Sequence, residues 1–161
     1  MSVLVSDRTE SRFEAITNSV TLHDMLIELM QRSFGVKDID KLVRLKYAYG
    51  DEENEDFYRY RYLMNNSKNR IDQIAALMTT NIRAANSIYP TTLHEYERRR
   101  DYQNSAIVCC EQLIHELQRV VEIFDVDINI YARYVSAIDR EIDLIKKWRQ
   151  RDNKLKSRLT G

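Results

Sequence analysis

The stretch from residue 128 to residue 149 reads INIYARYVSAIDREIDLIKKWR. Apolar side chains recur in it at alternating spacings of three and four residues, which is the repeat of an amphipathic α-helix. The repeat runs through Ile128, Tyr131, Val135, Ile138, Ile142 and Ile145 to Arg149, and a second stripe follows Leu144, Trp148, Leu155 and Leu159. Because Asp127 precedes the pattern as an N-cap, we predict a helix over residues 127–156.

Three more segments carry the same repeat, and we predict helices over residues 11–33, 55–88 and 92–124. In the first of them, the expected core stripe is Phe13, Ile16, Val20, Ile27, Met30 and Phe34, widened by Leu22, Leu26 and Leu29. Pro90 ends the second helix, because a proline disfavours the helical conformation of the residue before it. Thr92 and Glu95 form a capping box at the start of the third.

The longest connection between these helices is residues 36–54. Ile39, Leu42, Val43, Leu45 and Tyr47 favour a short helix within it. The acidic run at residues 51–56 is typical of an exposed loop. The sequence does not indicate a function for this acidic run.

The composition agrees with a helical protein. Three glycines and one proline among 161 residues are too few for the turns of a β-sandwich or barrel. No apolar run approaches the ~18 residues of a membrane span, and the first residues lack a signal-peptide segment, so we expect a cytoplasmic protein without membrane contact. Long helices with short connections predict one all-α domain over residues 1–161, an up-down-up-down antiparallel four-helix bundle.

Sequence motifs for catalysis are absent. Cys109 and Cys110 are adjacent within an apolar pattern and have no zinc-ligand spacing, so we interpret them as small core residues. Di-iron bundles need Glu-x-x-His on two helices, whereas Glu111 and His115 are four apart on one. No phosphate-binding loop or nucleophile elbow occurs. We expect a protein that is not an enzyme and has no cofactor, and a metal or small-molecule site in the bundle is the rival hypothesis.

A net charge of zero hides an asymmetry along the chain. Residues 1–56 hold 12 acidic and 7 basic residues, and residues 57–161 hold 13 acidic and 18 basic ones. The start of the third helix and the end of the fourth meet at one end of an antiparallel bundle, which predicts one cationic patch for nucleic acid or an acidic partner. Its expected residues are Arg98, Arg99, Arg100, Lys146, Lys147, Trp148, Arg149, Arg151 and Lys154. Alternatively, the basic residues only complement the helix dipole and aid solubility.

A second candidate surface alternates aromatic rings with arginines. Residues 57–62 read FYRYRY. Such a run suits a nucleic-acid surface or a protein interface, and equally a cap on the end of a bundle.

Two segments carry a resemblance to a known family. Residues 84–90 read AANSIYP and are followed by Glu95, by RRRDYQ at residues 98–103 and by Ala106-Ile107, while residues 144–154 read LIKKWRQRDNK. In these segments the chain resembles the accessory variability determinants of diversity-generating retroelements. Those proteins are four-helix bundles related in fold to the ribosomal RNA intervening-sequence proteins.

The resemblance implies a non-enzymatic accessory protein that forms a homo-oligomer, a pentamer in that family. Such a protein binds a reverse transcriptase and its template RNA or cDNA in mutagenic retrohoming. The chain departs from the family in its neutral charge, since family members are typically strongly basic. The alternative is a structural or interaction bundle of a phage or mobile element that binds no nucleic acid.

Overall fold

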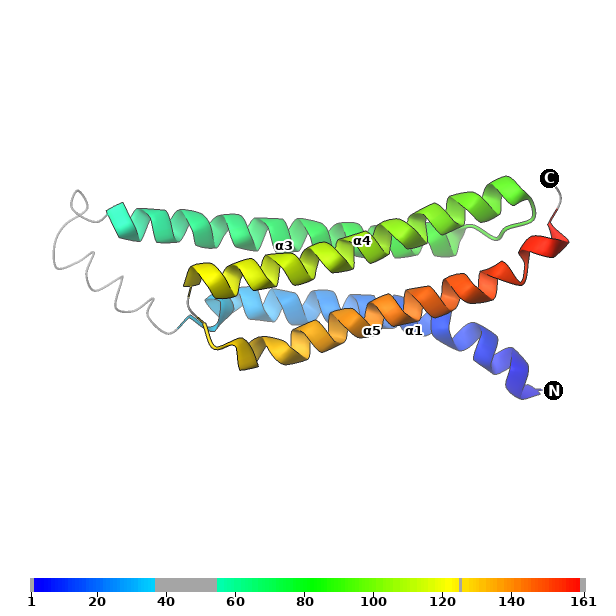
Figure 1. The fold of residues 1–161 in the computed structure, drawn as a ribbon, viewed down its shortest axis with the longest axis horizontal. Helices are drawn as coiled ribbons and strands as arrows, with labels where there is room; N and C mark the ends of the chain where they lie inside the picture. The colour runs from blue at the N-terminus through cyan, green and yellow to red at the C-terminus, as the bar shows by residue number, and fades with distance from the viewer. Residues whose placement is uncertain (1, 37–54, 125, 160–161) are drawn as a thin grey trace.

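The computed structural model describes residues 2–36, 55–124 and 126–159 (Figure 1). Four long helices make up most of it: α1 (Ser2–Gln31), α3 (Glu55–Ser87), α4 (Leu93–Phe124) and α5 (Ile128–Asn153). Two single 3₁₀ turns, Ser33–Gly35 and Lys156–Arg158, follow α1 and α5. These ranges contain no strand, so the predicted all-α class is confirmed.

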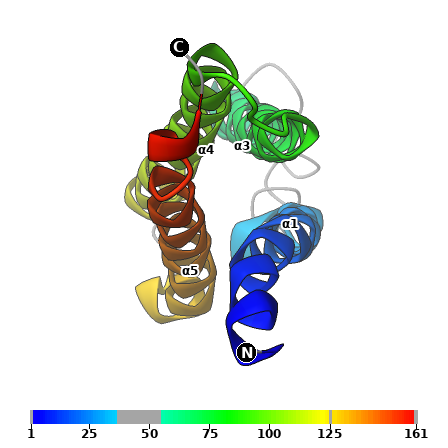
Figure 2. The same ribbon diagram turned by 90° about the vertical axis from the view of Figure 1, so that its right-hand side faces the viewer.

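The four helices pack as a closed square. Helix α1 contacts α3 and α5, and α4 contacts the same two helices from the opposite corner (Figure 2). Successive helices run in opposite directions along the long axis (Figure 1). This is the predicted up-down-up-down bundle, and helices of 26 to 33 residues make it about 40–50 Å long.

The helix boundaries follow local signals in the sequence. At the start of α4, the Thr92 hydroxyl accepts a hydrogen bond from the Glu95 amide (3.2 Å), and the Glu95 carboxylate accepts one from the Thr92 amide (3.2 Å). Asp127 caps α5 by accepting from the Asn129 amide at 3.0 Å. Both predicted caps are confirmed. The short helix predicted within residues 36–54 lies outside the described residues.

The buried face of α1 is rotated about the helix axis relative to the face that the sequence predicts. Phe13 and Val20, expected inside, are 52% and 40% exposed. Ala15 and Ser19 face the core instead, in line with the buried Leu22. Small side chains let two helices approach closely, so this face packs tightly although its residues contribute little to an apolar pattern. The sequence pattern included Leu22, Leu26 and Leu29 of this face and missed its small residues, Ala15 and Ser19.

The second stripe of α5 belongs to the core of the same chain. Leu144 and Trp148 are 6% and 2% exposed. The stripe lies there because four helices in a square enclose a wider face of α5 than one heptad seam covers. Conversely, Ile128 opens the seam but is 68% exposed at the end of the bundle.

Helix α1 begins nine residues before the predicted start at residue 11 and ends two residues before the predicted end, in a turn of unusual backbone geometry. Ser33 and Phe34 adopt positive φ angles of 50° and 59°, and Gly35 follows at 73°. The turn directs the Phe34 ring into the core, where it stacks on Phe124 at 6.5 Å between ring centroids. The Tyr131 hydroxyl donates a hydrogen bond to the Phe34 carbonyl at 2.7 Å. These contacts offset the cost of left-handed backbone at residues other than glycine.

The adjacent cysteines are core residues, as predicted. Cys109 and Cys110 are 3% and 0% exposed, and neither forms a disulfide. The Cys110 thiol lies 3.4 Å from the Met78 sulfur. Burial raises the pKa of both thiols, which keeps them protonated and unreactive.

Candidate nucleic-acid interface

The two basic segments meet at the end of the bundle that also holds the α3–α4 corner (Figure 1). Asn153 at the end of α5 accepts hydrogen bonds at 2.6 Å from the Tyr96 hydroxyl and from the Arg100 guanidinium. One turn further along, the Arg149 guanidinium donates to the Asn104 side chain at 2.7 Å. The start of α4 is thereby joined to the end of α5.

A buried ion pair lies beneath this surface. The Arg99 guanidinium is 3.0 Å from the Asp152 carboxylate, which also accepts a hydrogen bond from Gln103 at 2.9 Å. The guanidinium lies over the Trp148 ring, 5.0 Å from its centroid. Burial lowers the pKa of Arg99 and raises that of Asp152, while their mutual attraction opposes both shifts. Removing either partner would leave a buried unpaired charge, which typically costs about 3–5 kcal/mol.

Two predicted site residues are therefore structural. Arg99 and Trp148 are 4% and 2% exposed, so neither can contact a partner in this conformation. The sequence placed them on the surface because three consecutive arginines and a lone tryptophan in a basic tail both suggested contact with a partner. The bundle instead closes around Asp152, and its carboxylate holds one of the three arginines inside.

The remaining predicted residues are accessible to different degrees. Arg98, Lys146, Lys147 and Lys154 are exposed, and Arg100, Arg149 and Arg151 are half-buried. Arg98 and Arg100 are separated by about 200° around α4. Because Arg100 faces Asn153 on α5, Arg98 points away from that helix. The single patch expected from the sequence is thus divided into the cationic end of α5 and a separate arginine on the far side of α4.

Two further residues at this end were missed by the sequence reasoning. Arg12 on α1 lies close enough to Arg99 and Asp152 to influence the pKa of both. Tyr89, in the corner between α3 and α4, is 80% exposed. Its position directly before Pro90 was a signal that it lies in a turn, but nothing in the sequence indicated that its ring would face solvent.

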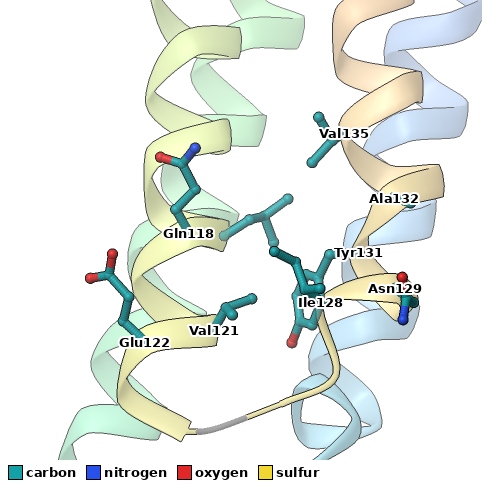
Figure 3. A pocket seen from close by; sticks show the side chains of 9 residues that line it. Gln118, Val121, Glu122, Ile128, Asn129, Tyr131, Ala132 and Val135 are labelled. Carbon is teal, nitrogen blue, oxygen red and sulfur yellow. The ribbon is translucent and has the colours of Figure 1, made fainter.

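The opposite end of the bundle carries an apolar groove between α4 and α5 (Figure 3). Its volume is about 770 Å³. Val121 on α4 and Val135 on α5 line its walls. Ile128, the first residue of α5, also lines it. Gln118 and Glu122 lie on the α4 side. The groove is suited to an apolar side chain, and no charged group of α5 lines it.

Potential catalytic and metal-binding groups are dispersed. Glu111 and His115 are both exposed on α4. His23 lies 3.2 Å from Asp72 on the surface between α1 and α3. Across the part of the chain that the structure describes, no three His, Cys, Asp or Glu residues are grouped as metal ligands.

The protein is thus an all-α bundle with basic residues at one end and an apolar groove at the other end. Comparison of the chain with protein-family models, with curated proteins and with solved structures gave no match. Within the described ranges, no helix combines the length and the apolar character needed to cross a membrane.

Proposed function

We propose that this protein is a non-enzymatic accessory protein of a diversity-generating retroelement, which binds a reverse transcriptase and its template RNA or cDNA. The two segments that carry the family resemblance, residues 84–107 and 144–154, are far apart in the chain. In the bundle they lie against each other, joined by the Arg99–Asp152 ion pair and the Arg100–Asn153 hydrogen bond. The two segments together therefore build one end of the bundle.

The observation that carries the proposal is the charge of the α5 end. From Lys146 to Arg158 the chain has seven basic residues and a single acidic one, Asp152. Asp152 is buried and paired with Arg99, so it offsets none of the surface charge. The neutral total of the whole chain therefore conceals a locally cationic surface. Such a surface attracts phosphates and releases their condensed counterions.

Charge reversal at this end tests the proposal. The double variant Lys146→Glu/Lys147→Glu should bind a single-stranded RNA at least tenfold more weakly in fluorescence anisotropy. In the parent protein, log Kd should rise with log salt by roughly 0.7 per contacted phosphate, and this slope should fall in the variant. Both residues are exposed, so the fold should be unaffected.

The matched control is Arg32→Glu/Arg119→Glu, which makes the same change in net charge at the opposite end of the bundle. Both arginines are exposed. This control should bind RNA like the parent. If both double variants lose the same RNA affinity, the loss reflects the overall charge of the protein and not a site. If the Lys146→Glu/Lys147→Glu variant binds RNA as tightly as the parent, the proposed site is wrong.

A second candidate function is that of an interaction module that only assembles with itself. The apolar groove between α4 and α5 favours it, because Ile128 beside the groove is 68% exposed and complementary in character to the groove itself. In a symmetric pair, each copy can insert Ile128 into the groove of the other. Oligomerisation without RNA binding would favour this function over the first.

A further inference from the structure

Among the large apolar and aromatic residues whose exposure the structure describes, Tyr89 is the most exposed, at 80%. An aromatic ring that its own fold leaves in water is a candidate contact residue, because tyrosine is among the residues that most often dominate binding interfaces. At this end of the molecule the sequence predicted Trp148 as the contact ring. Trp148 is instead buried in the bundle and packs against the Arg99 guanidinium.

The backbone on both sides of Tyr89 is held in place. The buried Arg99 guanidinium donates a hydrogen bond to the Ile88 carbonyl at 3.2 Å. The Glu95 carboxylate accepts from the Thr91 amide at 2.7 Å and from the Thr91 hydroxyl at 2.8 Å. Pro90 between them is buried and has a fixed φ angle. The backbone that carries the ring therefore needs little ordering when a ligand covers it.

Around the corner lie two exposed arginines, the exposed Glu97, and Glu95, whose carboxylate binds Thr91 and Thr92. Arg83 precedes Tyr89 and Arg98 follows it, each within about two helical turns of the corner, and both are exposed. The amides of Thr91 and Thr92 just before α4 donate to the Glu95 carboxylate, and the Glu95 amide donates to the Thr92 hydroxyl, so these three amides are not free for a phosphate. A ligand here therefore meets arginine side chains for its charge and the Tyr89 ring for a flat apolar group.

We propose that Tyr89 stacks on an unpaired base of a single-stranded nucleic acid whose phosphates contact Arg98 and Arg83. The inference rests on the proposed function and adds a residue that contacts the bases rather than the phosphate backbone. Every nucleobase has a flat face, so the contact favours single strands over duplexes without selecting a sequence.

An abasic oligonucleotide separates stacking from charge. It carries the same phosphates as an oligouridine of equal length but offers no base to stack. The parent protein should prefer the oligouridine by about 5- to 150-fold, the range of one base–aromatic contact. Tyr89→Ser should remove this preference and leave the affinity for the abasic strand unchanged, and Tyr89→Phe should retain it. Because the ring is exposed, the substitution should not impair folding.

Tyr62→Ser is the matched control, since Tyr62 is 66% exposed near the start of α3, at the other end of the bundle. It should keep the preference. If Tyr62→Ser removes the preference instead, the stacking surface is the tyrosine-rich start of α3, and the assignment to Tyr89 is wrong. If Tyr89→Ser weakens capture of a reverse transcriptase but not the preference for bases, Tyr89 is a protein contact and the inference is likewise wrong.

The outcomes also distinguish this inference from the function on which it rests. Salt-dependent binding of both oligonucleotides that is indifferent to Tyr89 overturns the inference alone. Failure of the parent to bind either oligonucleotide in a salt-dependent way overturns the proposed function and the stacking contact with it.

Discussion

At the scale of single residues, Glu141 is a carboxyl group in the centre of the bundle. It is 0% exposed, and one of its oxygens accepts a hydrogen bond from the side-chain amide of Asn18 on α1 at 2.7 Å. The other oxygen has no hydrogen-bond partner among the described residues. Burial raises the pKa of Glu141 to about 8, against the opposing effects of Asn18 and Arg140. The side chain is therefore protonated at neutral pH, so the core contains no unpaired charge at this position.

This protonation makes stability depend on pH. Below pH 4.5 both the folded and the unfolded protein hold the proton on Glu141, and above about pH 8 neither does. Between these limits only the folded state holds it, so raising the pH favours unfolding. Glu141→Gln should therefore match the parent near pH 4.5 and exceed its free energy of unfolding by roughly 2–4 kcal/mol at pH 9.

Urea denaturation across this pH range measures the difference. Asp139→Asn is the control, because Asp139 is an exposed carboxylate on the same helix. This variant should keep the pH dependence of the free energy of unfolding that the parent shows. A constant difference between Glu141→Gln and the parent over the whole range would mean that Glu141 is ionised in the folded protein.

At the scale of elements, the corner between α3 and α4 is organised by a capping box with additional hydrogen bonds. One oxygen of the Glu95 carboxylate accepts hydrogen bonds from Thr91 and Thr92, and those from Thr91 are the main reason that its pKa is lowered. One carboxylate thus caps α4 and fixes the residues that follow Pro90. The same interactions stabilise the helix and hold Tyr89 in position.

Loss of the cap should destabilise the protein measurably. Thr92→Ala removes the hydroxyl that accepts from the Glu95 amide, and we expect a cost of about 1 kcal/mol in the free energy of unfolding. Thr80→Ala is the matched control in the middle of α3, where the hydroxyl only donates to the Ala76 carbonyl within the same helix. It should change stability by less than about 0.5 kcal/mol. Equal costs in urea denaturation would show that the cap contributes nothing.

At the scale of the whole molecule, the two ends of the bundle differ in character. One end is cationic and presents Tyr89, and the other presents an apolar groove beside Ile128. Separate surfaces of this kind would let the protein bind an anionic partner and assemble with itself at the same time. Helix α5 contributes to both, with its lysines at the end and Ile128 at the start.

Assembly can be tested through the groove. We predict a homo-oligomer, so light scattering at micromolar concentration should give a mass above the 19.2 kDa of one chain, five times that mass if the family resemblance extends to ring size. Ile128→Glu places a charge beside the groove and should reduce the mass. Leu77→Glu alters a 53% exposed residue on α3 and should not. A parent protein of one chain mass would refute self-assembly.

The sequence by itself determined the helical class, the bundle topology and most helix boundaries. These properties depend on local signals: the three–four repeat, Pro90, and the caps at Thr92 and Asp127, whose interactions lie within a few residues along the chain. It also identified two basic segments that the antiparallel topology brings to one end of the bundle.

Only the tertiary structure decided which faces are buried and which site residues are accessible. Ala15 and Ser19 replaced Phe13 and Val20 in the core, because the rotation of a helix is set by how closely its neighbours can pack. Arg99 is inside, paired with a carboxylate 53 residues away along the chain, while its neighbour Arg98 is exposed. Burial of a charge depends on a partner that folding brings to it, and no local pattern contains that information.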